Sequence, residues 1–241
     1  MKKYAAIIPA FNEEKAITNV VNAIYLFGER NSIQIKPIVV NDCSSDNTVN
    51  VAAKLNCIVL DLTINLGIGG AVQTGLLYAW KHGYDYVIQV DGDGQHPAEE
   101  IIKLINFMEN NNSDVVIGSR FITKTGFQST ILRRIGITYF SILIRFLTTY
   151  KITDCTSGFR LYNRNALEIL KDRYPDEYPE PEAFVIFKKE GFKISEVAVN
   201  MEERKGGISS ITGLSSLYYI FKVTLAILFK QISYKTWKEY K

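Results

Sequence analysis

Short apolar stretches alternate with amphipathic ones through the first 120 residues of the chain. The short apolar runs are typical of buried strands, and the stretches with apolar residues at every third or fourth position are typical of helices. Strand and helix alternation of this kind predicts an α/β fold with a mainly parallel sheet covered by helices on both faces. The predicted strands cover residues 4–9, 35–41, 57–60, 86–91 and 115–119, and the predicted helices cover residues 14–27, 46–55, 70–82 and 98–110.

The second half of the chain has a different pattern. Residues 131–150 are apolar and aromatic with three embedded arginines, and residues 214–232 form a final apolar helix that carries two lysines. The proline- and acid-rich residues 174–182 predict a loop, and residues 194–200 predict a late strand.

Composition narrows the class of protein. The chain has 241 residues, of which 47% are hydrophobic and 22% are charged, as expected for a folded globular protein. Its net charge of +3 is too small to predict a nucleic-acid partner. The three cysteines form no Cys-x-x-Cys pair, and the N-terminus lacks a signal-peptide pattern. We therefore expect the body of the protein to lie in the reducing cytoplasm.

The most informative polar segment is Asp-Gly-Asp-Gly-Gln-His-Pro at residues 91–97, where a predicted strand ends. Parallel sheets bind ligands at the carboxyl ends of their strands. The glycine between Asp91 and Asp93 allows a tight turn, so both carboxylates can face one hard cation, and Gln95 is placed to add another oxygen. We therefore predict that these three residues bind Mg²⁺ or Mn²⁺. The alternative is a solvated acidic turn, because Asp and Gly are common in turns.

Two further polar segments follow predicted strands. Residues 9–14 read Pro-Ala-Phe-Asn-Glu-Glu, and residues 41–48 place Asp42 at a strand tip, where a carboxylate can accept hydrogen bonds from a base or a ribose. The local alternatives are an acidic helix start and a plain capping loop. Residues 65–71 carry several glycines and by themselves are only a weak match to a phosphate-binding loop.

In this order, these segments resemble family-2 glycosyltransferases with the GT-A fold. Within that family the match is to the branch that loads sugars onto polyprenyl phosphates, such as dolichyl-phosphate mannose synthase. The Pro-Ala-x-Asn-Glu of residues 9–13 and the Gln-His-Pro after the aspartate pair are similar to the branch's motifs. Asn41 and Cys43 depart from its Asp-Asp-Gly sequence, so only Asp42 carries over there. The resemblance covers about residues 4–210.

Later segments are similar to motifs of the same branch. They are Gly-Ser-Arg at 118–120, the pair Arg134 and Thr138, Asp-x-x-Ser-Gly-Phe-Arg at 154–160, and Arg-x-x-Gly-x-Ser at 204–209. For a single arginine such as Arg134, the alternative is a surface ion pair. The resemblance implies that the acceptor phosphate is bound by Arg120, Arg134, Thr138, Arg160 and Ser209.

The resemblance also implies an activity: inverting, metal-dependent transfer of a sugar from a nucleotide-sugar donor to a polyprenyl phosphate. A phosphate monoester has its second ionisation near pH 6, so the acceptor is already anionic and hardly needs a base. The implied catalytic residues are Asp93, Asp154 and Arg204, with Asp154 orienting or deprotonating the acceptor. The implied donor-binding residues are Pro9, Ala10, Asn12, Glu13, Asp42, Gly69, Asp91 and Gly92.

We expect a GT-A domain over residues 1–210, with a donor half at 1–120 and an acceptor half at 121–210, and a membrane-associating helix within 211–241. Neither apolar stretch of the second half offers the about 20 uninterrupted apolar residues of a spanning helix. Helices with apolar faces and basic flanks predict peripheral binding to the cytoplasmic side of a membrane. The alternative is two core helices that pack on the sheet, and a separate small membrane protein is a further partner to consider.

Two other functions stay open at this point. One is a soluble family-2 transferase that adds a sugar to a polysaccharide or glycan hydroxyl, which would require a carboxylate base. The other is a sugar-nucleotide-binding protein without catalysis. A nucleotidyltransferase is disfavoured, since the N-terminal segment lacks a glycine-rich, lysine-bearing loop. The sequence leaves open which sugar and which polyprenyl chain are used, and whether the donor is a UDP-sugar or a GDP-sugar.

Overall fold

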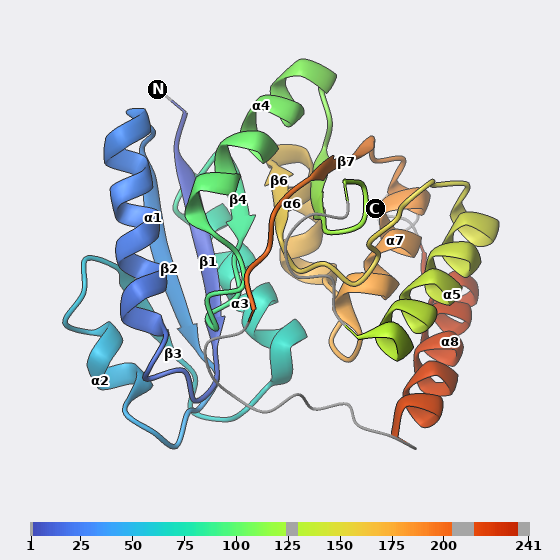
Figure 1. The fold of residues 1–241 in the computed structure, drawn as a ribbon, viewed down its shortest axis with the longest axis horizontal. Coiled ribbons are helices and arrows are strands. Elements are labelled where there is room, and N and C mark those ends of the chain that lie inside the picture. Colours follow the sequence, from blue (N-terminus) through green and yellow to red (C-terminus); the bar gives the residue numbers. More distant parts are fainter. Residues whose placement is uncertain (1, 124–129, 204–214, 236–241) are drawn as a thin grey trace.

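The computed structural model describes residues 2–123, 130–203 and 215–235. A seven-stranded sheet of order β3-β2-β1-β4-β6-β5-β7 runs through the molecule (Figure 1). Neighbouring strands are parallel except at β6, which is antiparallel to both β4 and β5. The strands are β1 (Tyr4–Ala10), β2 (Ile35–Asn41), β3 (Ile58–Asp61), β4 (Tyr86–Gln89), β5 (Val115–Ser119), β6 (Arg160–Asn163) and β7 (Ile194–Ala198). The predicted α/β class and mainly parallel sheet are confirmed.

Helices cover both faces of this sheet (Figure 1). Side chains alternate along a strand, so Ile8 of β1 packs with one helical layer while Ile7 packs with the other. The first layer contains α1 (Ile17–Asn31), α2 (Thr48–Ala52) and α4 (Ile101–Asn111), which follows a short 3₁₀ turn. The second contains α3 (Gly67–Lys81), α5 (Ile131–Thr148), α6 (Arg164–Arg173), α7 (Pro179–Glu190) and α8 (Ser215–Ser233).

The prediction of a loop over residues 174–182 is wrong at its C-terminal end, because α7 begins at Pro179. Proline suits the first turn of a helix, whose N–H groups have no partner within the helix. Glu180 and Glu182 lie in the same turn, where negative charge is favourable. The proline and acid content therefore marks a helix start rather than a continuous loop.

A close approach between α3 and the segment before α7 fixes where that helix start lies. A Cβ atom added to Gly69 would lie 2.3 Å from the carbonyl oxygens of Pro175 and Asp176. Only glycine permits this approach, since a side chain would overlap the backbone. The contact holds the start of α7 beside the carboxyl end of the sheet.

The last helix, α8, packs on the domain through one face. Its Val223 and Ile227 are buried, and Thr224 lies 3.2 Å from the hydroxyl of Tyr139 on α5. Among the described residues, none of the helices is both long and apolar enough to cross a membrane. The expected boundary near residue 210 lies outside the described residues.

Candidate active site

A cavity of about 690 Å³ opens where β1, β2 and β4 end, and we call it the strand-end cavity. This volume lies within the range of about 300–1,000 Å³ that is usual for small-molecule sites. Its wall includes eight residues singled out from the sequence: Pro9, Ala10, Asn12, Glu13, Asp42, Asp91, Gly92 and Asp93. Gly69 is not among the lining residues, although its neighbours Gly67 and Ile68 are. Three separate sequence segments therefore meet at one edge of the sheet.

Hydrogen bonds tie the loops of this rim together. The amide oxygen of Asn12 accepts from the backbone N–H of Ser45 at 2.8 Å. The carboxylate of Asp42 accepts from the backbone N–H of Leu66 at 2.7 Å, at the start of α3. Burial raises the pKa of Asp46, but hydrogen bonds from Thr48 and from backbone N–H groups outweigh it, so that the pKa is lowered. The rim is thus held in shape without a ligand.

The two departures from the family sequence have local explanations. Asn41 donates a 2.8 Å hydrogen bond to the Asp61 carboxylate, where an aspartate would place two negative charges side by side. Cys43 occupies a position usually held by glycine and adopts a φ of 58°, in the left-handed region that glycine enters most readily. The turn geometry is therefore kept at some cost in backbone strain.

Asp93 is 2% exposed, and its Oδ1 atom accepts a 2.9 Å hydrogen bond from the backbone N–H of Gln95. The turn after it needs Gly94, whose φ is 81°. Gly92, expected from the sequence to make the turn, is required for a different reason: a Cβ atom there would lie 3.0 Å from the Pro9 carbonyl oxygen. The two glycines thus let the aspartate pair sit tightly against β1.

His96 supports the first aspartate of the pair. Its Nδ1 atom accepts from the backbone N–H of Asp91 at 3.0 Å, and its Nε2 atom lies 3.6 Å from the Asp91 carboxylate. The ring is 6% exposed and stacks on Phe159 at a centroid distance of 4.8 Å. The histidine of the Gln-His-Pro segment therefore orients Asp91 and does not face the cavity itself.

The residues around the strand-end cavity fit a divalent cation. Five carboxylate side chains line it, and Arg133 is the single basic residue in its described wall. Mg²⁺ is usually held by one or two carboxylates together with substrate phosphates. The described residues contain no group of three or more acidic, histidine or cysteine side chains able to bind a metal on their own. The carboxylates that line the wall are Glu13, Asp42, Asp91, Asp93 and Glu180.

Gln95, predicted as a third metal ligand, is not among the residues that line the cavity. The backbone N–H of Gln95 donates to the Asp93 carboxylate, and its backbone carbonyl accepts from the backbone N–H of Glu202 at 3.0 Å. Of the three predicted metal ligands, Asp91 and Asp93 line the strand-end cavity.

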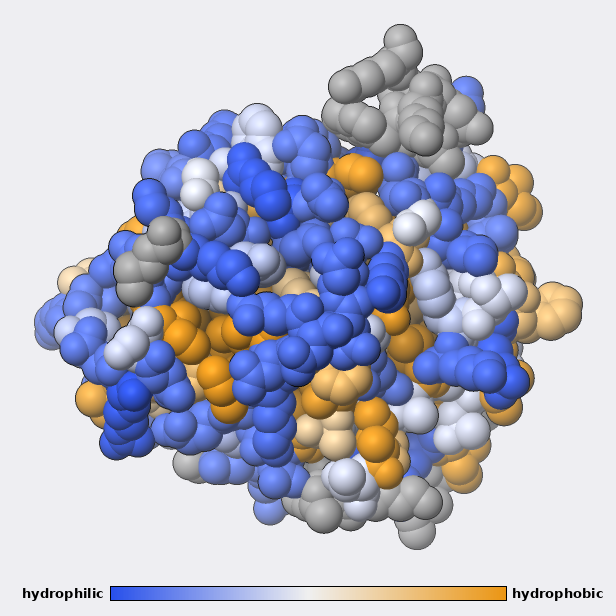
Figure 2. All heavy atoms as spheres, turned by 90° about the horizontal axis from the view of Figure 1, so that it is seen from above, coloured by the Kyte–Doolittle hydropathy of each residue, from blue (hydrophilic) through white to orange (hydrophobic). Residues whose placement is uncertain are grey.

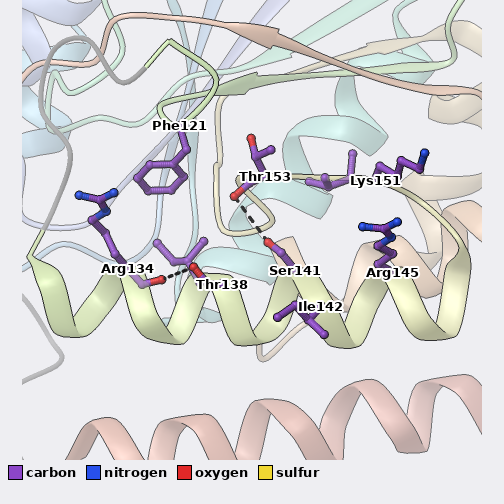
Figure 3. Close-up of a pocket in the computed structure, with 10 residues that line it drawn as sticks. Phe121, Arg134, Thr138, Ser141, Ile142, Arg145, Lys151 and Thr153 are labelled. Carbon is purple, nitrogen blue, oxygen red and sulfur yellow. Dashed lines mark hydrogen bonds between the residues drawn. The ribbon is translucent and has the colours of Figure 1, made fainter.

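A second cavity, of about 420 Å³, lies along α5, and we call it the α5 cavity (Figure 3). Two predicted acceptor residues, Arg134 and Thr138, line it together with Arg145 and Lys151. Figure 3 shows the two arginines extending from one side of the helix toward the segment that carries Thr153. The rest of its wall consists of apolar side chains and the hydroxyl residues Ser141 and Thr153, so this cavity combines positive charge with hydrophobic surface.

Arg120 and Asp154, predicted to act on the acceptor, form a buried ion pair with each other. The guanidinium donates two hydrogen bonds of 2.7 Å to the two carboxylate oxygens, and the side chains are 6% and 0% exposed. Neither residue is among those that line the two cavities. The pair instead braces the segment of residues 153–156, which has Thr153 in the α5 cavity and Thr156 in the strand-end cavity.

Arg160 is fully buried and also lines neither cavity. It donates to the backbone carbonyls of Ser157, Cys155 and Glu180. Its position is that of a structural arginine, and we leave it out of the acceptor site. Arg204 and Ser209, also singled out from the sequence, lie outside the described residues.

Two charged lining residues of the strand-end cavity, Arg133 and Glu180, were not among the predicted site residues. The motif match selects Arg134, and only the phase of α5 shows that Arg133 and Arg134 line different cavities. Glu180 lay in the segment predicted as a loop. The signal that could have found it was the helix-start pattern of Pro179 followed by acid.

The fold and the strand-end cavity define a glycosyltransferase of the GT-A class. The sequence profile of glycosyl transferase family 2 matches residues 5–170, and the chain belongs to this family. It is similar to the UDP-N-acetylglucosamine–dolichyl-phosphate N-acetylglucosaminyltransferase of Methanococcus voltae, with 33% identity over 80% of this chain and 83% of that protein. It is also similar to the polyprenol monophosphomannose synthase of Mycolicibacterium smegmatis, with 28% identity over 90% and 84% of the two chains.

Solved structures share the fold at low sequence identity. Glucosyl-3-phosphoglycerate synthase from Mycobacterium tuberculosis, solved with Mn²⁺, UDP-glucose and phosphoglyceric acid, matches with a TM-score of 0.71 and 17% identity over 97% of this chain and 81% of that one. TarS residues 1–349 from S. aureus, in complex with UDP-GlcNAc, match with a TM-score of 0.62 and 22% identity. That match covers 94% of this chain but 66% of the TarS chain.

Proposed function

We propose that this glycosyltransferase moves a sugar from a nucleotide-sugar donor to a polyprenyl phosphate, with inversion at the anomeric carbon. The proposal rests on two cavities of different character that share the segment of residues 153–156 as part of their walls. The strand-end cavity is rich in carboxylates, whereas the α5 cavity carries arginine and lysine. Arg133 and Arg134 are consecutive residues, and each lines a different one of them.

In this proposal, the strand-end cavity holds the donor. Asp91 and Asp93 would hold Mg²⁺ or Mn²⁺, which supplies positive charge to the departing diphosphate. Asp42 and the 9–13 segment would bind the nucleoside, and His96 keeps Asp91 oriented. The names of the polyprenyl-phosphate relatives, and the Mn²⁺ and UDP-glucose bound by the structural neighbour, support this assignment.

The α5 cavity would hold the acceptor phosphate. Arg134 can pair with its oxygens, and the hydroxyl of Thr138 lies one helical turn away on the same face. Because the phosphate is anionic near neutral pH, positioning rather than proton removal is the task of the protein. Asp154 is not needed as a base, and both of its oxygens already accept from Arg120.

We expect Arg134→Ala to raise the KM for polyprenyl phosphate about 10- to 100-fold, the usual effect of losing a hydrogen bond to a charged group. The assay offers a panel of UDP- and GDP-sugars with undecaprenyl or dolichyl phosphate. Donor hydrolysis should be kept, because Arg134 does not line the strand-end cavity. Arg164→Ala, at the amino-terminal side of α6, is the matched control. Transfer to a glycan hydroxyl, with none to lipid phosphate, would contradict the proposal.

A membrane surface fits the outer faces of α5 and α8. Large apolar side chains project from the side of the molecule that carries α5 and α8, at the right of the view (Figure 2). Phe146 of α5 and Ile232 of α8 are each 82% exposed, and basic residues lie beside them on both helices. Apolar residues with basic flanks are typical of helices that lie in the membrane interface. The exposed apolar residues are Ile135, Tyr139, Ile142 and Phe146 on α5, and Tyr218, Phe221, Leu225, Leu228, Phe229 and Ile232 on α8.

We expect the full chain to float with liposomes that contain anionic lipid, and the variant Phe146→Asp/Phe229→Asp to bind at least tenfold less. Each change removes an apolar side chain whose burial is worth about 1.5–3 kcal/mol and adds a charge that anionic lipid repels. Leu26→Asp is the control, since Leu26 is an exposed apolar residue on α1, far from α5 and α8. Equal flotation of all three proteins would refute the proposed surface, as would no binding by the wild type.

A further inference from the structure

Glu180 adds an acidic side chain to the wall of the strand-end cavity, and it comes from a helix, α7, rather than from a segment that follows a strand. It lies in the first turn of α7, whereas Asp91 and Asp93 follow β4. The backbone carbonyl of Glu180 accepts a 2.9 Å hydrogen bond from the buried guanidinium of Arg160. Together with the Gly69 contact, this bond fixes the start of α7 at the cavity wall.

The surroundings of this carboxyl group are partly apolar and partly hydrogen-bond donors. Burial, and to a smaller extent the negative charge of Asp91, raise the pKa of Glu180, while the charge of Arg160, a backbone N–H and the Gln89 amide oppose that effect. Gln89 is 0% exposed, and its Nε2 atom reaches no hydrogen bond of good geometry among the described residues. The same is true of Arg160 Nη1. The carboxyl group therefore lies beside these donor groups and also forms part of the cavity wall.

The charge of the donor decides which part of it this carboxyl group can face. A nucleotide sugar carries its negative charge on the diphosphate, which the metal bound to Asp91 and Asp93 would neutralise. A further carboxylate beside the diphosphate would repel it. Sugar hydroxyls, by contrast, are uncharged donors that a carboxylate accepts well, with bonds to charged groups worth about 1.5–3 kcal/mol.

We infer that Glu180 binds hydroxyl groups of the donor sugar and helps to select which sugar is transferred. The inference rests on the proposed function, because it requires a nucleotide sugar in the strand-end cavity. It assigns a specificity role to a residue that belongs to neither the proposed metal ligands nor the proposed acceptor site. Arg160 holds the backbone carbonyl of Glu180, and the residue itself lines the cavity.

The test compares two ligands in the presence of Mn²⁺: the best nucleotide sugar of the donor panel, and the matching nucleoside diphosphate without its sugar. Glu180→Gln keeps the size of the side chain but replaces one acceptor oxygen with a donor. We expect its Kd for the nucleotide sugar to rise about 10- to 100-fold, and its Kd for the bare nucleoside diphosphate to change less than threefold. Glu177→Gln, an exposed neighbour that does not line the cavity, is the matched control.

Other roles for Glu180 give other results. A metal ligand would lose Mn²⁺ affinity in the variant, and a general base would lose kcat while both Kd values stayed unchanged. Equal weakening of both ligands would mark a purely structural role. Each of these results overturns the inference. If Glu180→Gln does not fold, Glu180→Asp, which keeps the charge and withdraws it by one methylene, should show the same contrast between the ligands.

The proposed function would fail separately. In that case the wild-type protein itself would bind no nucleotide sugar with Mn²⁺, whatever residue stands at position 180. A wild type that binds and transfers, combined with a Glu180→Gln variant that treats both ligands alike, would reject the inference alone.

Discussion

Asp93→Ala is expected to lower sugar transfer by about 10³-fold or more at saturating Mn²⁺. Loss of one preorganised group that stabilises developing charge typically costs about 10²–10³ in kcat, and loss of a metal ligand also lowers the occupancy of the ion. Asp93 is 2% exposed and lies in the turn after β4, where its backbone neighbours hold it in place. The same side chain accepts the Gln95 N–H, which adds a small cost in stability.

The measurement is release of nucleoside diphosphate and formation of lipid-linked sugar, each titrated against Mn²⁺. The variant Asp93→Asn keeps the side-chain volume and one acceptor oxygen but removes the negative charge. Because the charge is what holds the cation, we expect this variant to be nearly as inactive as Asp93→Ala. Glu109→Gln, in an exposed ion pair with Lys2 at the opposite edge of the sheet, should leave activity unchanged. Activity of Asp93→Ala within threefold of wild type, with the same dependence on Mn²⁺, would contradict the assignment.

Asp154→Ala is expected to reduce the free energy of unfolding by about 3–5 kcal/mol, because Arg120 would be left buried without its counter-charge. For a chain of this size, that loss corresponds to a fall of roughly 10 °C in Tm. The two hydrogen bonds of 2.7 Å and the near-complete burial of both side chains are the basis for this magnitude. Urea unfolding followed by circular dichroism measures it.

The double variant Arg120→Met/Asp154→Leu serves as the control, since replacing a buried pair with apolar residues of similar volume is often neutral or stabilising. We expect it to recover most of the stability that Asp154→Ala loses. If Asp154→Ala instead unfolds like the wild type while losing transfer, then Asp154 acts in catalysis rather than in holding Arg120.

The strand-end cavity could be predicted from the sequence because its parts are local. The three segments singled out from the sequence each follow a strand directly, and parallel strands place their carboxyl ends at one edge of a sheet. Asp42, Asp91 and the residues of 9–13 therefore meet as soon as the strand order is right. The strand-helix alternation of the first 120 residues predicted the parallel sheet, and the structure supplies the order β2-β1-β4 that sets the three strand ends side by side.

The acceptor side was harder to predict because it depends on helix phase and burial. Arg133 and Arg134 look equivalent in sequence, but a rotation of about 100° per residue sends them to different cavities. Arg120 and Arg160 match motif positions, yet both are buried and held by groups from distant parts of the chain. Motif matching identifies such residues, but their burial follows from β6 and α7, which the sequence pattern did not reveal.

The central claim is that Asp91 and Asp93 hold a cation against the diphosphate of the donor. Anomalous diffraction from crystals grown with Mn²⁺ and the nucleoside diphosphate of the best donor tests it most directly. We predict one manganese peak about 2.1 Å from oxygens of both aspartates and of the diphosphate. A peak elsewhere, or nucleotide bound while the two carboxylates point away from it, would contradict the claim.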